Sequence, residues 1–181
     1  MDAFGMSKTN ALKVAILAVI LGGAIYFAVH QHSPHPLAIG ETAPSFTVPA
    51  MPSGYLALNQ YRQQVVVLHF WATWCPPCVE EAPSLEVFAE KMKTQGIVVL
   101  GVSVDDDRTA LQNFIENYHL RFAVGIDPDR SLAARFGTVQ FPETYILDRQ
   151  GRLAEKVIGA TDWNDSRLES FVLELARAPG R

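Results

Sequence analysis

Both cysteines of this 181-residue chain, Cys75 and Cys78, lie in the stretch FWATWCPPCVEEAP at residues 70–83. A structural zinc site commonly uses two such cysteine pairs, or one pair followed by two closely spaced histidines, and no such histidine pair follows here. A purely structural disulfide between them would close a very short loop and remove little entropy from the unfolded chain. The chemistry that remains is a dithiol that cycles between its reduced and oxidised forms.

The position of the pair predicts a different task for each sulfur. A continuous apolar run, VVVLHFWA at residues 65–72, predicts a buried strand, and apolar residues at helical spacing follow the pair. Cys75 would then lie at a helix N-terminus, where unpaired N–H groups and the helix dipole favour a thiolate. Pro76 and Pro77 suit a first turn, whose N–H groups need no partner. We expect Cys75 to be the exposed nucleophile and Cys78, one turn further and buried, to resolve the mixed disulfide.

Strands and helices alternate along the rest of the chain. A β-hairpin is predicted at residues 43–61, buried strands at 65–72, 97–105 and 122–127, and an antiparallel strand pair at 144–148 and 152–159. Helices are predicted at 76–95, 107–119, 128–137 and 162–178, the last with Asp162 as its N-cap. This order predicts an α/β sandwich around a mixed sheet.

A separate signal precedes this domain. Residues 12–29 carry one charge, Lys13, and form an apolar run long enough to cross a bilayer, which takes about 17–25 residues. Lys8 and Lys13 precede the apolar core, and the next basic residue is Arg62, so the positive-inside rule places the N-terminus in the cytoplasm. A cleaved signal peptide is the alternative, although its apolar region is usually shorter. Both interpretations place the domain in an oxidising compartment.

We therefore expect a single-pass protein of the inner (cytoplasmic) membrane with an extracytoplasmic, periplasmic domain. Its parts would be a cytoplasmic N-terminus at 1–10, a transmembrane signal anchor at 11–29, a linker at 30–38 and one domain at 39–181. The net charge of -4 and the pI near 5.7 argue against a nucleic-acid partner, which requires a basic face. The linker stretch HQHSPHP is interpreted as a polar spacer, with copper or zinc binding by its histidines as the alternative. We expect no metal site and no cofactor.

Two motifs carry a family resemblance. FWATWCPPC, followed by Glu81 and Pro83, resembles the TlpA/ResA/DsbE group of membrane-anchored thioredoxin-like proteins. FPETYILD at 141–148 resembles the second signature of that group, a strand entered through a cis-proline. The resemblance covers residues 38–178 and implies a protein-disulfide reductase. Its fold would be a thioredoxin-like three-layer α/β/α sandwich with a mixed central sheet, an N-terminal β-hairpin and a strand–helix unit inserted at residues 97–119.

The resemblance also implies roles for single residues. Trp74 matches the exposed indole beside the nucleophile, and Pro142 matches the cis-proline that faces the pair. Phe141 would offer its backbone groups to an extended substrate strand. Glu81 matches an acidic residue near the buried cysteine, with a solvated helix carboxylate as the alternative. Pro83 matches the proline that kinks the active-site helix.

His69 departs from the pattern of the group. It stands in the strand before the pair, where proteins of this group often have asparagine and thioredoxins a buried aspartate. We expect His69 under Cys78, where an imidazole that titrates near neutrality could take up the proton that Cys78 must lose. The alternative is a buried neutral histidine satisfied by a hydrogen bond.

The charges around the pair predict the direction of electron flow. No Lys or Arg lies between Gln63 and Glu90, and four acidic residues follow the pair: Glu80, Glu81, Glu86 and Glu90. Acidic neighbours oppose the helix dipole and keep the thiols protonated, which weakens the advantage of the reduced form. We predict a reductant with a potential near or below about -270 mV.

The resemblance further implies partners. Proteins of the group reduce apocytochrome c for haem attachment or copper-carrier proteins for oxidase assembly, and a membrane thiol transporter supplies their electrons. PET at residues 142–144 favours the haem-maturation members, whereas Gln140 and Phe141 replace their small Gly-Ala pair. One alternative is a copper-binding carrier that uses both cysteines and a histidine. Another is a peroxidase, whose frame requires proline and threonine where this chain has Leu68 and Ala72.

Overall fold

The computed structural model describes residues 8–30 and 36–178, which belong to two units that divide near residue 35. The first unit contains one helix, α1 (Lys8–His30). Among the described residues, no helix meets the length and apolarity needed to span a membrane. Most of the N-terminal segment expected at 1–10 and of the linker expected at 30–38 lies outside the described residues.

The second unit is built on a mixed five-stranded sheet with the order β5-β4-β3-β6-β7. Its parallel strands are β3 (Val65–Trp71), β4 (Ile97–Ser103) and β5 (Ala123–Ile126). The strand β6 (Glu143–Leu147) pairs antiparallel with β3, and β7 (Leu153–Ile158) pairs antiparallel with β6. The mixed sheet predicted from the sequence is confirmed.

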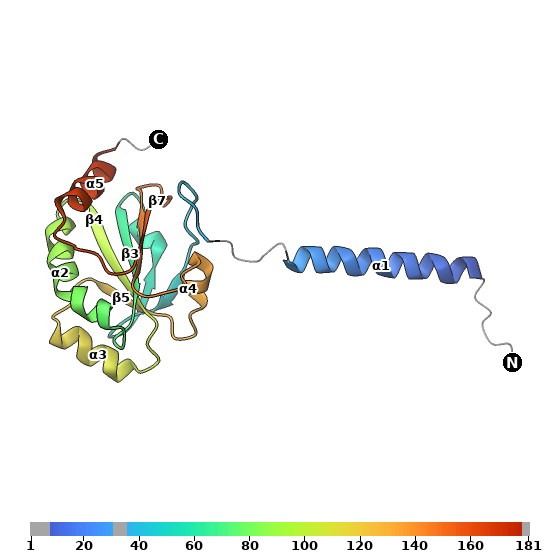
Figure 1. Cartoon of the computed structure of the whole chain (residues 1–181), viewed down its shortest axis with the longest axis horizontal. Coiled ribbons are helices and arrows are strands. Elements are labelled where there is room, and N and C mark those ends of the chain that lie inside the picture. Colours follow the sequence, from blue (N-terminus) through green and yellow to red (C-terminus); the bar gives the residue numbers. More distant parts are fainter. Residues whose placement is uncertain (1–7, 31–35, 179–181) are drawn as a thin grey trace. The chain divides into compact units, whose positions relative to one another are not determined.

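Helices cover both faces of this sheet. They are α2 (Pro76–Lys93), α3 (Arg108–Asn117), α4 (Ser131–Phe136) and α5 (Ser166–Arg177). Figure 1 shows α2 and α5 on one side of the sheet and α4 on the other. The predicted hairpin is also present: β1 (Thr47–Pro49) and β2 (Tyr55–Ala57) form a small antiparallel sheet, and a 3-10 turn at Leu58–Tyr61 follows it.

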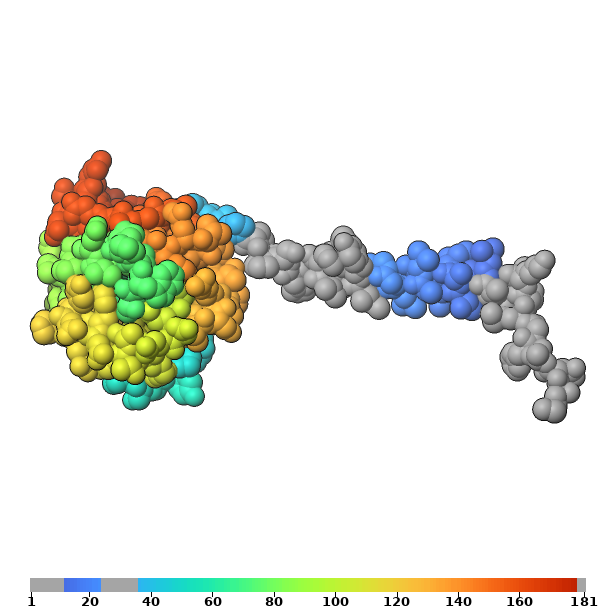
Figure 2. All heavy atoms as spheres, turned by 60° about the horizontal axis from the view of Figure 1, so that its bottom comes forward, coloured from blue at the N-terminus to red at the C-terminus, as the bar shows by residue number. Residues whose placement is uncertain are grey.

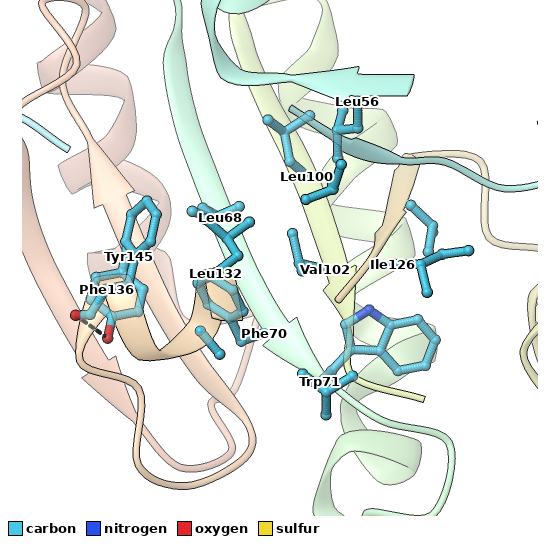
Figure 3. Packing of buried hydrophobic residues seen from close by; sticks show 14 of the residues in the cluster. Leu56, Leu68, Phe70, Trp71, Leu100, Val102, Ile126, Leu132, Phe136 and Tyr145 are labelled. Atoms are coloured by element: carbon cyan, nitrogen blue, oxygen red, sulfur yellow. Dashed lines mark hydrogen bonds between the residues drawn. The ribbon is translucent and has the colours of Figure 1, made fainter. Parts of the chain in front are cut away.

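Side chains of β3 alternate between two cores. Leu68 and Phe70 enter the larger core, where the ring of Phe70 lies 5.5 Å from that of Phe136 and 5.8 Å from that of Tyr145 (Figure 3). Val65 and Val67 enter the core under α2 and α5. Because every residue of β3 is buried, its sequence is an apolar run with a single polar member. That member, His69, lies at the active-site end of the strand.

The last helix begins later than the sequence predicted. The N-cap of α5 is Asp165, whose side chain accepts a hydrogen bond from the Arg167 N–H at 2.9 Å. Asp162 instead accepts a hydrogen bond from the Asn164 N–H at 3.0 Å, in a turn that precedes the helix. Between the two aspartates Trp163 is 1% exposed. The turn places this indole under α2. The prediction of Asp162 as the N-cap is therefore wrong, because the helix begins only after the turn.

The hairpin contacts the sheet at Gly125 of β5. A Cβ atom at this position would lie 2.6 Å from Cγ2 of Val48 and 3.0 Å from Cδ2 of Leu56. Gly125 also forms a β-bridge with Ala50. The close approach of the hairpin therefore requires a residue without a side chain here.

We expect Gly125→Ala to lower the free energy of unfolding by about 1–3 kcal/mol, because the added methyl group overpacks this interface. Urea denaturation of the purified protein measures the change. Ser53→Ala, at an exposed position in the hairpin turn, is the control and should leave stability unchanged. Unchanged stability of Gly125→Ala would contradict a tightly packed hairpin.

Candidate active site

Cys75 and Cys78 form a disulfide at the N-terminus of α2, with their Cα atoms 5.3 Å apart. Cys75 is the N-cap residue, in extended conformation, and its carbonyl accepts a hydrogen bond from the Val79 N–H at 3.1 Å. Pro76 and Pro77 fill the first turn. The Cys75 sulfur therefore lies at the positive end of the helix dipole, which stabilises negative charge.

Cys75 is more enclosed than the sequence predicted, whereas Cys78 is buried as expected. Cys75 is 5% exposed and Cys78 is 1% exposed, so the expectation of an exposed Cys75 is wrong for this disulfide form. The reason is that the sheet continues directly into the site, and Cys75 joins the same hydrophobic core as Phe70. The neighbouring Trp74 is 54% exposed, and its side chain forms the solvent-exposed surface of the loop, called the open surface below.

The loop before β6 faces this surface. The Phe141–Pro142 peptide bond is cis, and Pro142 is buried. The ring of Phe141 meets the ring of Trp74 edge to face, with centroids 6.1 Å apart. The structure thus brings together two motifs that lie far apart in the sequence.

Two buried carboxylates, those of Glu143 and Asp105, hold the loops of the site. The sequence had not indicated a role for either of them. Glu143, 0% exposed, forms an ion pair with Lys156 and accepts hydrogen bonds from the Val139 N–H at 3.2 Å and the Tyr145 hydroxyl at 2.9 Å. These contacts fix the loop that carries Phe141 and Pro142. In the sequence, the one sign of these contacts is that the acidic Glu143 directly follows Pro142.

Asp105 holds the other loop, which connects β3 to α2. Its carboxylate accepts hydrogen bonds from the Thr73 N–H at 3.0 Å, the Thr73 hydroxyl at 2.6 Å and the Ser103 hydroxyl at 2.6 Å. Asp105 lies just beyond the end of β4, which pairs in parallel with β3. The parallel register therefore delivers this carboxylate to the loop before Cys75.

His69 lies on the face of the sheet that α2 covers. Its Nδ1 is 2.9 Å from the hydroxyl of Thr144, its register partner on β6, and its Nε2 is 3.4 Å from Oε1 of Glu81. The imidazole also meets the Trp163 ring edge to face, with centroids 6.1 Å apart. Burial lowers the pKa of His69 to about 3, so the imidazole is neutral near pH 7.

Glu81 stands three residues after Cys78 on α2, hence on the same side of the helix. It is 5% exposed, so the alternative of a solvated carboxylate is wrong. Its Oε2 accepts hydrogen bonds from the Thr161 N–H at 2.9 Å and the Trp163 indole N–H at 3.1 Å, while its Oε1 faces His69 without a hydrogen bond. Burial raises the pKa of Glu81, and the two N–H donors act against that rise.

The other acidic residues after the pair have different surroundings. Glu86 accepts a hydrogen bond from the Arg121 N–H at 2.8 Å, Glu90 pairs with the Arg121 guanidinium at 3.4 Å, and Glu80 is exposed. A basic side chain that the local sequence did not show, Arg130, lies over the Trp74 ring. The charge near the pair is therefore set by fewer acidic groups than the sequence suggested. Among the described residues, no group of three or more His, Cys, Asp or Glu side chains is arranged to hold a metal ion.

Known proteins share this architecture. Residues 39–156 match the model of the AhpC/TSA family. The thiol-disulfide oxidoreductase ResA of Bacillus subtilis (strain 168) is 30% identical over 84% of this chain and 83% of its own length. ResA of Bacillus anthracis is 29% identical over 94% of this chain and 99% of its own length.

Solved structures agree. A secreted thiol-disulfide isomerase from Corynebacterium glutamicum superposes with a TM-score of 0.69 and 28% identity, covering 75% of this chain and 86% of that one. A secreted Mycobacterium tuberculosis disulfide oxidoreductase, described as homologous to DsbE of E. coli, superposes with a TM-score of 0.62 and 26% identity, covering 70% and 93%. The chain therefore belongs to the AhpC/TSA family of thioredoxin-like proteins, as a ResA/DsbE-like thiol-disulfide oxidoreductase whose redox-active disulfide joins Cys75 and Cys78.

Proposed function

We propose that this protein is an extracytoplasmic reductant of protein disulfides, with apocytochrome c as its client in cytochrome c maturation. The observation that carries the proposal is the position of the pair: Cys75 caps α2 next to the open surface at Trp74, and Cys78 lies behind it. Cys75, 5% exposed, is the cysteine beside this surface, so in the proposed reaction the client sulfur approaches Cys75 and not Cys78, which is 1% exposed. The membrane anchor at 11–29 is part of the proposal and rests on the apolar sequence. The secreted relatives support a site outside the cytoplasm.

In the proposed reaction two electrons pass from the reduced pair to the client. The Cys75 thiolate attacks one client sulfur, and the second client sulfur leaves and takes up a proton. Cys78 then loses its proton and attacks the Cys75 sulfur. The first client sulfur leaves as a thiolate, and the Cys75–Cys78 disulfide seen in the structure is the product. A membrane thiol transporter would return two electrons and complete the cycle.

Glu81 is the group best placed to receive the proton of Cys78. Its Oε1 accepts no hydrogen bond, and its pKa is raised by burial, so a proton is held there more readily than on a solvated carboxylate. His69 is less suited, because burial opposes the imidazolium and the ring does not titrate near neutrality as the sequence suggested. We propose that His69 orients Glu81, while Thr144 fixes the ring from the other side.

The same groups support the reducing direction. Glu81 places negative charge one turn from Cys78, and the neutral His69 offers no positive charge to oppose it. Both conditions disfavour a Cys78 thiolate and so destabilise the reduced form relative to a pair with basic neighbours.

The choice of client rests on the resemblance at PET. Two residues of this motif also form hydrogen bonds in the site: Glu143 to the Val139 N–H of the loop, and Thr144 to the imidazole of His69. Copper-carrier proteins are the alternative clients, and a trapping experiment distinguishes the two.

We expect a reduction potential at or below about -230 mV for the Cys75–Cys78 pair, measured by equilibration against a dithiol buffer at pH 7. Glu81→Gln should make the pair less reducing, because the Cys78 thiolate no longer faces a carboxylate. Glu90→Gln is the control of equal charge change, since Glu90 pairs with Arg121 instead. A wild-type value near -120 mV would identify an oxidant and contradict the proposed direction.

Cys78→Ser should accumulate a mixed disulfide through Cys75 when it is reduced and mixed with an oxidised apocytochrome peptide, because the resolving thiol is missing. Mass spectrometry of the non-reduced product measures the adduct. Cys75→Ser is the matched variant and should form little adduct, since Cys78 is 1% exposed. Trapping of an oxidised copper-carrier protein in preference to the apocytochrome peptide would refute the proposed client.

His69→Asn should remove part of the acid sensitivity of the fold. The pKa of His69 is lowered to about 3 in the folded protein, whereas an unfolded histidine titrates near 6.5. As the pH falls below 6.5 the unfolded chain binds a proton that the folded chain does not, so stability is lost. The loss amounts to about 2 kcal/mol at pH 5.

Urea denaturation between about pH 7 and pH 5 checks this prediction: the stability of the wild type should fall by about 2 kcal/mol more than that of His69→Asn. Glu81 is present in both proteins, so its contribution to the pH dependence of stability cancels to first order in the difference between them. His119→Asn is the control, because His119 is exposed and adopts a left-handed conformation that asparagine tolerates. Equal slopes for the wild type and His69→Asn would contradict a histidine that is buried and neutral.

A further inference from the structure

The open surface beside the disulfide carries an arginine. The guanidinium carbon of Arg130, an exposed residue before α4, lies 5.7 Å from the ring centroid of Trp74 and 5.9 Å from that of Phe141. We name Arg130, Trp74 and Phe141 the client rim. In Figure 2 the green surface around residue 80 adjoins the orange surface around residue 140, which agrees with the contact between these two rings.

The guanidinium of Arg130 has no acidic partner among residues 36–178. The nearest acidic residues in the sequence are engaged elsewhere: Asp129 accepts a hydrogen bond from the Ser131 N–H at 3.1 Å, and Asp127 accepts from the Leu132 N–H at 3.0 Å. The N–H donors of Arg130 therefore remain available to a bound molecule.

The two rings and the turn hold Arg130 in place. The flat guanidinium is attracted to the aromatic faces, so the Arg130 side chain has less conformational freedom than an ordinary exposed arginine. It therefore loses less conformational entropy on binding. The backbone of Arg130 has a φ of 57°, and its N–H donates to the Asp127 carbonyl at 3.0 Å. A pre-oriented guanidinium with free donors matches the planar geometry of a carboxylate.

We propose that Arg130 selects clients that carry an acidic side chain close to the disulfide under attack. This inference rests on the proposed function, because the bound segment must be the part of the client that presents its sulfur to Cys75. Trp74 and Phe141 both neighbour the reactive residues, so a segment that reaches Cys75 passes along the client rim. An Asp or Glu in that segment pairs with Arg130, and a Lys or Arg is repelled.

Three oxidised peptides test the inference, identical except for Asp, Asn or Lys beside the disulfide. We expect the full-length reduced protein to show a kcat/KM about three- to fivefold higher for the Asp peptide than for the Asn peptide, in line with an exposed charge pair. Arg130→Gln should abolish the difference, and Arg130→Glu should reverse the order in favour of the Lys peptide. The effect should weaken with added salt.

Two controls separate selection from a general effect on the sulfurs. Arg62→Gln removes an exposed arginine that precedes β3, at the opposite end of this strand from Cys75, and should keep the wild-type preference. With an uncharged small disulfide, Arg130→Gln should change the rate by a much smaller factor than with the Asp peptide. A lower rate with that disulfide by the same factor as with the Asp peptide would overturn the inference, since Arg130 would then act on Cys75 itself.

The outcomes also separate this inference from the proposed function. Equal reduction of all three peptides by the wild type overturns the selection by Arg130 and leaves the reductant in place. A preference that persists unchanged in Arg130→Gln assigns the selection to another group and likewise overturns the inference. Reduction of none of the peptides overturns the proposed function, and the inference falls with it.

Discussion

The site depends on the complete burial of β3 between two cores. Val66, Leu68 and Phe70 pack in the larger core, and Val65 and Val67 pack under α2 and α5. Trp71, at the end of the strand, packs against Phe114 of α3, and every residue of the strand is buried. The strand ends at Trp71, four residues before Cys75. A close-packed interior transmits small displacements, so the sheet fixes where α2 begins and therefore where the first sulfur lies.

Buried carboxylates hold the loops outside the sheet in place. Asp105 binds the loop before Cys75, Glu143 binds the loop of the cis-proline, and Glu81 binds the turn that contains Thr161 and Trp163. Each accepts a hydrogen bond from a backbone N–H group that lies outside the helices and strands, and these hydrogen bonds offset the cost of burying the charge. Of these three carboxylates, Glu81 keeps one oxygen without a hydrogen bond, and this oxygen faces His69.

The sequence predicted those features that depend on local patterns. The apolar run at 65–72, the helical spacing after it and the two prolines were sufficient to locate the strand, the helix and the cysteine pair between them. Features that depend on distant neighbours could not be predicted in the same way. The indole of Trp163 against Glu81 and the position of Arg130 over Trp74 follow from packing between segments more than fifty residues apart, for which a single sequence holds no pattern.

The ion pair between Glu143 and Lys156 links the cis-proline loop to β7, the last strand of the sheet. Lys156 also lies 5.0 Å from the centroid of the Tyr145 ring, whose hydroxyl binds the same carboxylate. Edge strands tolerate sequence change more readily than central ones, because only one neighbour constrains them. A drift in sequence along β7 can therefore adjust the cis-proline loop while both cysteines and their helix stay unchanged. If this loop binds the client as proposed, related proteins with one redox pair can diverge in client preference by this route.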